Sequence, residues 1–138
     1  MAITQTTCTS FKVELLTGTH DFSSDVFKIA LYTGDATLGA DTTVYSTTNE
    51  TVASGYTAGG NTLTVSTTPT SSSTIAYISF ANTSWSSALT ARGALIYNSS
   101  KSNKAVSVLD FGADKTSNAT FVVTFPTADA TSAIVRIS

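Results

Sequence analysis

A stretch of 41 residues, from Thr51 to Ala91, contains no Asp, Glu, Lys, Arg or His. Within it, apolar residues alternate with Ser and Thr, which is the two-residue period of a strand that buries one face. General acid–base catalysis needs titratable side chains, and ordinary metal sites need carboxylate, imidazole or thiolate ligands. We therefore expect this part of the chain to be scaffold, and the sequence favours a structural module over an enzyme.

Hydroxyl side chains take the place of charged ones throughout the chain. Charged residues make up 12% of the 138 residues, about half of the usual share of roughly 25%. The apolar fraction of 41% is close to the ordinary range. Ser and Thr supply about a third of the sequence, and Thr favours strands because its branched Cβ suits a pleated sheet. This composition favours an all-β domain over a disordered Ser/Thr tract.

The charge balance argues against nucleic-acid and membrane partners. The net charge is −2 and the seven Lys and Arg residues are scattered, so no basic stripe can neutralise a phosphate backbone. No apolar run approaches the roughly 20 residues that cross a bilayer, and the first residues lack the basic and apolar regions of a signal peptide. We expect a product made in the cytoplasm, with the single cysteine, Cys8, as an incidental thiol.

Turn residues divide the chain into one short N-terminal helix and seven or eight strands. The helix is expected over 11–18, where Phe11 and Leu15 share a face and Gly18 can end the last turn. Short strands separated by turns predict an all-β fold, a two-sheet antiparallel β-sandwich with immunoglobulin-like or jelly-roll connections, in one domain over residues 1–138. The expected strands are 26–32, 61–67, 74–80, 93–97, 105–111, 120–125 and 133–137, with a further extended segment at 43–46 and turns at 69–73, 98–103 and 112–118.

The first ten residues differ from the rest of the chain. The segment from Ala2 to Ser10 is polar and rich in Thr. We interpret residues 1–10 as a candidate N-terminal arm, which would order on a neighbouring subunit by adding backbone hydrogen bonds to a sheet edge. Deleting such an arm would weaken assembly and leave the thermal midpoint of the domain nearly unchanged.

Two motifs resemble catalytic sites, and each has a simpler interpretation. The tripeptide from Asp110 to Gly112 matches the metal-binding triplet of kinases in letters alone, and we interpret it as a strand end followed by a turn. His20 precedes Asp21, but no nucleophile elbow accompanies the pair. We therefore expect His20 to make a capping or loop hydrogen bond.

Two pairs of aspartates flank loops, and they are the remaining candidates for a cation site. Asp35 and Asp41 flank one loop, and Asp110 and Asp114 flank another. Neither spacing follows the EF-hand pattern, and Asp commonly closes turns by bonding to nearby backbone amides. We expect no metal ligand, no cofactor and no catalytic residue.

Aromatic side chains are the candidates for a binding surface. Trp85, Tyr45 and Tyr56 lie outside the confident strands, whereas Tyr77 and Tyr97 lie within them. Trp85 can be a core anchor between sheets, a platform for a sugar ring or a subunit contact, and the sequence leaves the three open. Because Tyr and Trp are enriched at protein interfaces and in carbohydrate sites, we take Trp85, Tyr45 and Tyr56 as candidate interface or glycan contacts.

Four segments carry a resemblance to a known group of proteins. The run from Phe11 to Phe22, followed by Asp25 to Thr33, resembles the opening of a group of small virion structural proteins of tailed bacteriophages. The segments Ala91 to Asn98 and Ala105 to Gly112 resemble later strands of that group. The likeness spans most of the chain and rests on packing patterns, with no catalytic motif. It implies a particle component, either on the capsid or in the tail.

The resemblance and the composition together predict a structural role. We expect a capsid decoration or cement protein that docks on the major capsid protein, or on other virion proteins, as a homo-oligomer located in the virion. It would stabilise the shell by buried interface area, which suits a low-charge surface because charged residues are depleted at interface cores. The alternative is a tail or fibre module that binds a host-surface glycan.

Overall fold

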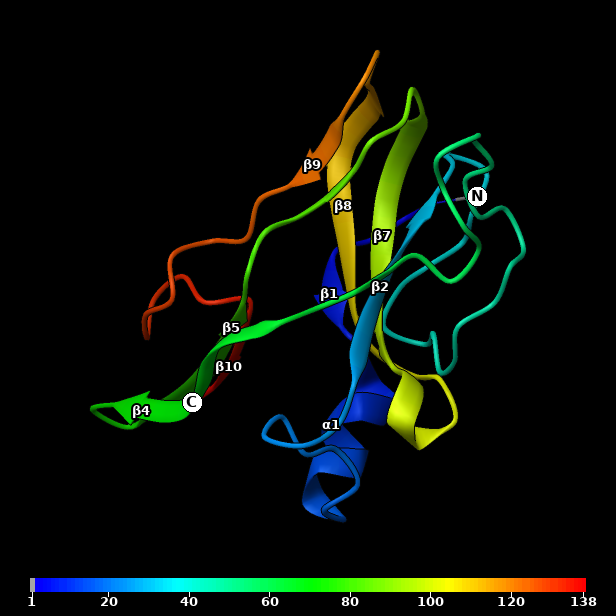
Figure 1. The fold of residues 1–138 in the computed structure, drawn as a ribbon. Helices are drawn as coiled ribbons and strands as arrows, with labels where there is room; N and C mark the ends of the chain where they lie inside the picture. Colours follow the sequence, from blue (N-terminus) through cyan, green and yellow to red (C-terminus); the bar gives the residue numbers. More distant parts are fainter. Residues whose placement is uncertain (1) are drawn as a thin grey trace.

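The computed structural model describes residues 2–138, and Met1 lies outside the described residues (Figure 1). The described chain contains one α-helix and ten strands, which confirms the expected all-β fold with a short N-terminal helix. The helix α1 spans Thr9–Leu16, and the 3-10 turn η1 spans Ser99–Lys101. The strands are β1 (Thr6–Thr7), β2 (Phe27–Tyr32), β3 (Asn61–Thr62), β4 (Val65–Ser72), β5 (Ile75–Phe80), β6 (Thr83–Trp85), β7 (Thr90–Asn98), β8 (Lys104–Thr116), β9 (Phe121–Val123) and β10 (Val135–Ile137).

The strands form two layers. One layer is a five-stranded antiparallel sheet in the order β1-β8-β7-β2-β3. The other layer is divided into a three-stranded sheet, β10-β5-β4, and a two-stranded sheet, β6-β9. In Figure 1 the two small sheets lie to the left of the large sheet, and the long connection of residues 33–60 lies to its right. The expected antiparallel sandwich is confirmed, with its second layer split in two.

Strands β2 and β7 form the centre of the large sheet. Ile29 and Leu31 of β2 project to one face, as the two-residue period predicts, and Ala30 and Tyr32 project to the other. All four are at most 1% exposed, so both faces of β2 are covered. The second face is buried because the connection of residues 33–60 packs over it.

Aromatic rings join the two layers. Phe22 stacks on Phe27 of β2 with ring centroids 4.3 Å apart. Phe80, at the end of β5, contacts both rings, and Phe125 lies 5.7 Å from Phe80. These four side chains belong to one continuous buried cluster.

Residues 2–10 pack on their own domain in this structure and do not extend as the candidate arm. Thr6 and Thr7 form β1, which pairs with β8. Ile3 is 7% exposed, and Cys8 is fully buried directly before α1. Deletion of this segment is therefore expected to lower the thermal midpoint, in contrast to the sequence-based expectation.

The region from Asn61 to Ser72 differs from the expected single strand and turn. It forms β3 and then β4, and β4 continues through Pro69, where the sequence predicts a turn. Pro69 is tolerated because β4 lies at the edge of its sheet and its pairing with β5 shifts register between Thr67 and Thr70.

Strand β8 is longer than the sequence predicts. The expected turn from Gly112 onward is a bulge within the strand: Gly93 of β7 pairs with Asp110, whereas Ala91 pairs with Lys115. Gly112 has a φ of +84°, which accounts for the turn-like signal in the sequence. The sequence does not predict strand β6, because the Ser-rich residues around Trp85 show no strand pattern. The strand pairs with β9.

Gly60 allows the connection of residues 33–60 to approach β2 closely. Its φ is +75°, and a Cβ added there would lie 1.8 Å from the carbonyl oxygen of Ile29. Only a residue without a side chain fits this position, so the path of the chain over the second face depends on Gly60.

Candidate functional site

Trp85 is part of the core. It lies in β6, pairs with Phe121 of β9, and is 4% exposed. Its ring lies 5.8 Å from that of Tyr56 and 6.3 Å from that of Phe121. Of the three roles that the sequence leaves open for Trp85, the structure matches the core anchor.

Tyr45 and Tyr56 converge on a buried carboxylate. The Tyr45 hydroxyl donates to Glu50 Oε2 at 2.6 Å, and the Tyr56 hydroxyl donates to Glu50 Oε1 at 2.6 Å. The amide of Gly59 also donates to Oε1, at 2.8 Å. Tyr45 stacks on Tyr97, and Tyr97 donates to the carbonyl of Gly59 at 2.6 Å. We call these five residues the tyrosine–glutamate cluster.

The tyrosine–glutamate cluster fixes residues 33–60 over the large sheet. Glu50 is 7% exposed, and Tyr56 also accepts from the amide of Leu31 in β2 at 2.8 Å. Burial, and then the hydrogen bond to Glu50, raise the pKa of Tyr45 and Tyr56 well above their usual range. Burial and the Glu50 charge raise the pKa of Tyr97 to about 12. The tyrosines therefore remain protonated donors.

This arrangement leaves no exposed platform made of Trp85, Tyr45 and Tyr56. Trp85 and Tyr56 are less than 9% exposed, and Tyr45 is half-buried against Tyr97. A sugar ring stacks on the open face of an aromatic side chain, so these residues fit structural roles better than glycan contact.

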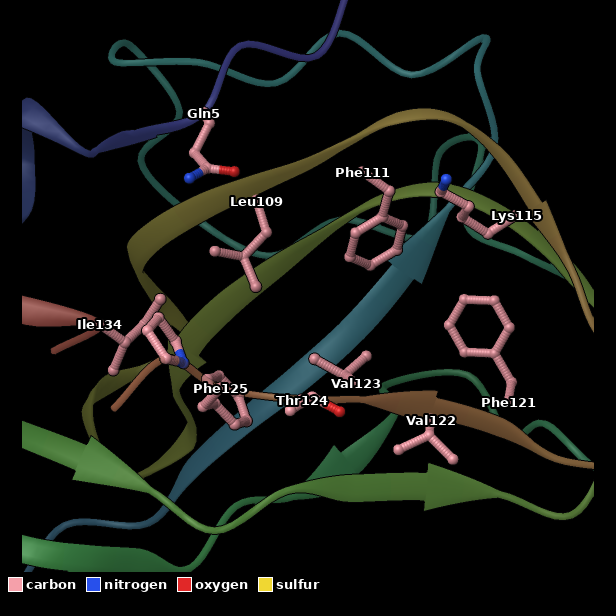
Figure 2. Close-up of a pocket in the computed structure, with 11 residues that line it drawn as sticks. Gln5, Leu109, Phe111, Lys115, Phe121, Val122, Val123, Thr124, Phe125 and Ile134 are labelled. Atoms are coloured by element: carbon pink, nitrogen blue, oxygen red, sulfur yellow. The ribbon is translucent and has the colours of Figure 1, made fainter. Parts of the chain in front are cut away.

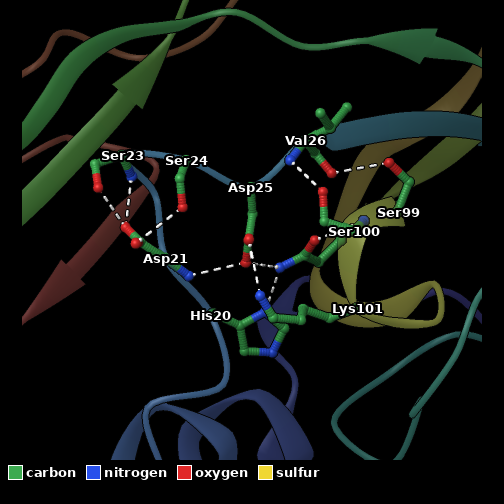
Figure 3. Close-up of polar contacts among 10 residues, drawn as sticks. His20, Asp21, Ser23, Ser24, Asp25, Val26, Ser99, Ser100 and Lys101 are labelled. Carbon is green, nitrogen blue, oxygen red and sulfur yellow. Dashed lines mark hydrogen bonds and ion pairs between the residues drawn. The ribbon is translucent and has the colours of Figure 1, made fainter.

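A second polar cluster, the histidine network, lies between α1 and the turn η1 (Figure 3). The His20 side chain is fully buried, and its Nε2 lies 2.8 Å from Glu14 Oε1. Asn98 Nδ2 lies 3.0 Å from His20 Nδ1 and donates to Asp25 Oδ2 at 2.8 Å. Lys101 donates to Asp25 Oδ1 at 2.9 Å. The expected hydrogen bond of His20 is present, with Glu14 and Asn98 as partners.

The partners of Asn98 define the tautomer of His20. Asn98 Oδ1 accepts from the amide of Ser100 at 3.0 Å, so the amide nitrogen Nδ2 faces both Asp25 and His20. His20 Nδ1 must then accept, and the ring proton lies on Nε2, where it donates to Glu14. Both ring nitrogens of His20 are thus engaged in hydrogen bonds within the fold.

An apolar opening lies between β8 and β9 (Figure 2). This β8–β9 groove has a volume of about 480 Å³. Leu109 and Phe111 line it from β8, and Phe121 and Val123 line it from β9. Val122, also in its lining, is 55% exposed. Lys115 is the only charged residue among those that line it, so the groove suits apolar contact and offers no acid–base chemistry.

The candidate cation sites do not assemble. Within residues 2–138 no group of three or more His, Cys, Asp or Glu side chains is close enough to hold a metal ion. Asp110 instead accepts from Arg92 Nε at 3.1 Å and from the amide of Gly112 at 2.9 Å, within the bulge of β8. Among the described residues, no helix has both the length and the apolar character needed to span a bilayer.

Comparisons with known proteins return no match: no family model, no curated protein and no solved structure is similar to this chain.

Sequence reasoning missed two residues that organise these clusters, Glu50 and Asn98. Glu50 directly precedes the charge-free stretch of residues 51–91. A lone carboxylate followed by Tyr and Gly residues is the sequence pattern that could have identified it. Asn98 gave no signal, because its neighbours predict a polar hairpin loop, and only the fold brings it to His20 and Asp25.

Proposed function

We propose that this chain is a structural protein of a bacteriophage virion, of the capsid decoration or cement kind. It docks on the major capsid protein, or on another virion protein, and stabilises the particle by buried apolar area. The β8–β9 groove is the docking surface in this proposal.

The observation that carries the proposal is the contrast between the interior polar groups and the β8–β9 groove. Glu50, His20 and Asn98 are bound to other groups of the same chain, so these three side chains are engaged within the fold. The groove is open, apolar and bordered by the exposed Val122. Exposed apolar patches of this kind commonly mark interaction sites.

The surface composition supports an assembly role. Charged residues are only 12% of the chain, and hydroxyl side chains replace them. A surface of this kind can be buried against a neighbour without desolvating many ions. The resemblance to small virion structural proteins points in the same direction.

A glycan-binding tail or fibre module remains the alternative proposal, but it needs a different surface from the one that the sequence suggests. Trp85 and Tyr56 are buried, and Tyr45 is stacked on Tyr97. The docking proposal is therefore the better supported of the two.

The proposal is tested by rebinding purified protein to particles that lack it. Val122→Asp places a carboxylate in the docking surface and is expected to weaken binding about tenfold or more, the value of one buried aliphatic side chain. The matched control is Val52→Asp, because Val52 is 94% exposed and lies outside the groove. Both variants should keep the wild-type thermal midpoint. Equal binding by Val122→Asp and wild type would contradict the proposed docking surface.

A further inference from the structure

A second apolar groove lies between α1 and β10, and it is separate from the β8–β9 groove. It has a volume of about 390 Å³. Phe11, Leu15 and Leu16 line it from the helix, and Val135 and Ile137 line it from the strand. We call it the α1–β10 groove.

The α1–β10 groove continues into a neighbouring hollow of about 250 Å³. Phe11, Leu15, Val135 and Ile137 line both openings. Ile78 of β5 lines the second one, together with the polar side chains of His20 and Asp21. The two openings thus share an apolar wall between the helix and the three-stranded sheet.

Apolar side chains at the rim of this groove face solvent. Leu16 is 90% exposed, and Ile137 is 52% exposed. Single exposed apolar residues are common, but two at the rim of one apolar groove form a contiguous patch. Covering this patch would remove apolar area from water.

Strand β10 has a free edge. It pairs with β5 along one edge, and the sheet order β10-β5-β4 leaves no strand on its other edge within residues 2–138. A free edge presents backbone N–H and C=O groups that can bind an extended segment of another chain.

Both charged side chains that line the groove are cations. Lys12 and Arg136 have no carboxylate within ion-pair distance in the described part of the chain, whereas Arg92, Lys101 and Lys104 each have one. Asp129 is close enough to Arg136 to feel its charge, but its carboxylate is bound to the amides of residues 131 and 132. The groove therefore has a positive rim that complements an acidic partner.

We propose that the α1–β10 groove binds an extended acidic and apolar segment of a partner protein by strand addition. The segment pairs with the free edge of β10, packs its apolar side chains against Leu15 and Leu16, and places its carboxylates near Lys12 and Arg136. This contact goes beyond the docking surface proposed above. With two separate grooves, one chain can bridge two neighbours, which is what reinforcing a shell requires.

The test uses the purified chain and two synthetic eight-residue peptides, one alternating Val with Asp and the other alternating Val with Lys. We expect the Val/Asp peptide to bind about fivefold more tightly, the order expected from two exposed ion pairs. Amide chemical-shift changes should cluster at residues 12–16 and 134–137. Because the assay needs no particle, its result is independent of the proposed docking on the shell.

Charge reversal provides the decisive variant. Lys12→Glu combined with Arg136→Glu should reverse the preference between the peptides, whereas the control Lys115→Glu, an exposed cation in the other groove, should preserve it. A preference that survives the double reversal, or shift changes centred on residues 109–125, would overturn the proposal. Concentration-dependent shifts of the same amides without peptide would also overturn it, because a second copy of the chain would then be the occupant.

Discussion

The two faces of the five-stranded sheet are covered by different chemistry. The face toward β5, β6 and β9 is covered by aromatic rings, among them Phe80, Trp85 and Phe121. The opposite face is covered by residues 33–60, which are fixed by hydrogen bonds to the buried Glu50. Aromatic packing is governed by buried area, whereas the polar cover depends on a few directional bonds. Damage to the aromatic packing should therefore destabilise the whole domain. Damage to the polar cover should destabilise residues 33–60 alone.

The largest effect is expected from Trp85→Ala on the aromatic face. Truncating a buried Trp removes its contacts with Tyr56 and Phe121 and leaves a cavity, which costs roughly 3–5 kcal/mol. Urea denaturation should report this loss, and β5, β6 and β9 should all become less protected from hydrogen exchange. The control Val52→Ala should stay within about 0.5 kcal/mol of wild type. A loss for Trp85→Ala as small as that of the control would show that the ring is not a core anchor.

A smaller effect is expected from Glu50→Gln on the polar face. The amide cannot accept from Tyr45, Tyr56 and the Gly59 amide together, and the unmade bonds cost roughly 1–3 kcal/mol. Hydrogen exchange should rise within residues 33–60 and stay low in β5 and β9. Equal increases on both faces would contradict the distinction between a local and a global cover.

The histidine network predicts how the stability of the fold depends on pH. Burial raises the pKa of Asp25, but hydrogen bonds from Asn98, Lys101 and the Asp21 amide outweigh it and hold the pKa below its usual range. A carboxyl with a lowered folded-state pKa stabilises the fold above its unfolded value, about 3.9, and this contribution is lost as pH falls through the folded value. We expect the urea midpoint of the wild type to fall more steeply below about pH 4 than that of Asp25→Asn.

Lys101→Met refines the pH experiment, because it removes one donor to Asp25 and leaves Asn98 in place. Its acid dependence should lie between those of the wild type and Asp25→Asn. Identical acid profiles for all three proteins would mean that Asp25 contributes nothing to the pH dependence of stability.

The last and smallest effect is expected in the rate at which Cys8 is chemically labelled. Burial, followed by the charges of Glu14 and Asp41, raises the pKa of the Cys8 thiol to about 11. Because the thiolate is the reactive form, iodoacetamide at pH 8 should modify the native protein slowly and the urea-unfolded protein quickly. Rapid modification of the native protein would show that residues 2–10 detach from the sheet, as an arm would.

The sequence predicts the β-fold well where one residue period dominates. Phe121 and Val123 lie in β9 within the strand expected over 120–125, and both are buried, as is Phe125 two residues beyond β9. The sequence does not predict strands whose pairing depends on distant residues. Strand β6 forms by pairing with β9, and no local sequence pattern indicates this pairing. Edge and bulge positions fail for the same reason, because Pro69 and Gly112 have the same sequence signature in a strand as in a turn.

The candidate site could be predicted only in part. The sequence proposes Trp85, Tyr45 and Tyr56 as candidate interface or glycan contacts, whereas the fold places Trp85 and Tyr56 in the core and stacks Tyr45 on Tyr97. Whether Trp85 faces solvent or core depends on the second layer, which the sequence does not specify. The grooves depend on which elements the fold places next to each other. Lys12 and Arg136 are far apart in the sequence, and they line one groove only because α1 and β10 lie side by side.

The most direct test of the proposed virion role is the copy number of this chain relative to the major capsid protein in purified phage particles, measured by quantitative mass spectrometry. A capsid decoration protein is expected at a copy number comparable to that of the shell protein. A few copies per particle would favour the tail, and absence of the chain from purified particles would contradict the proposed virion role.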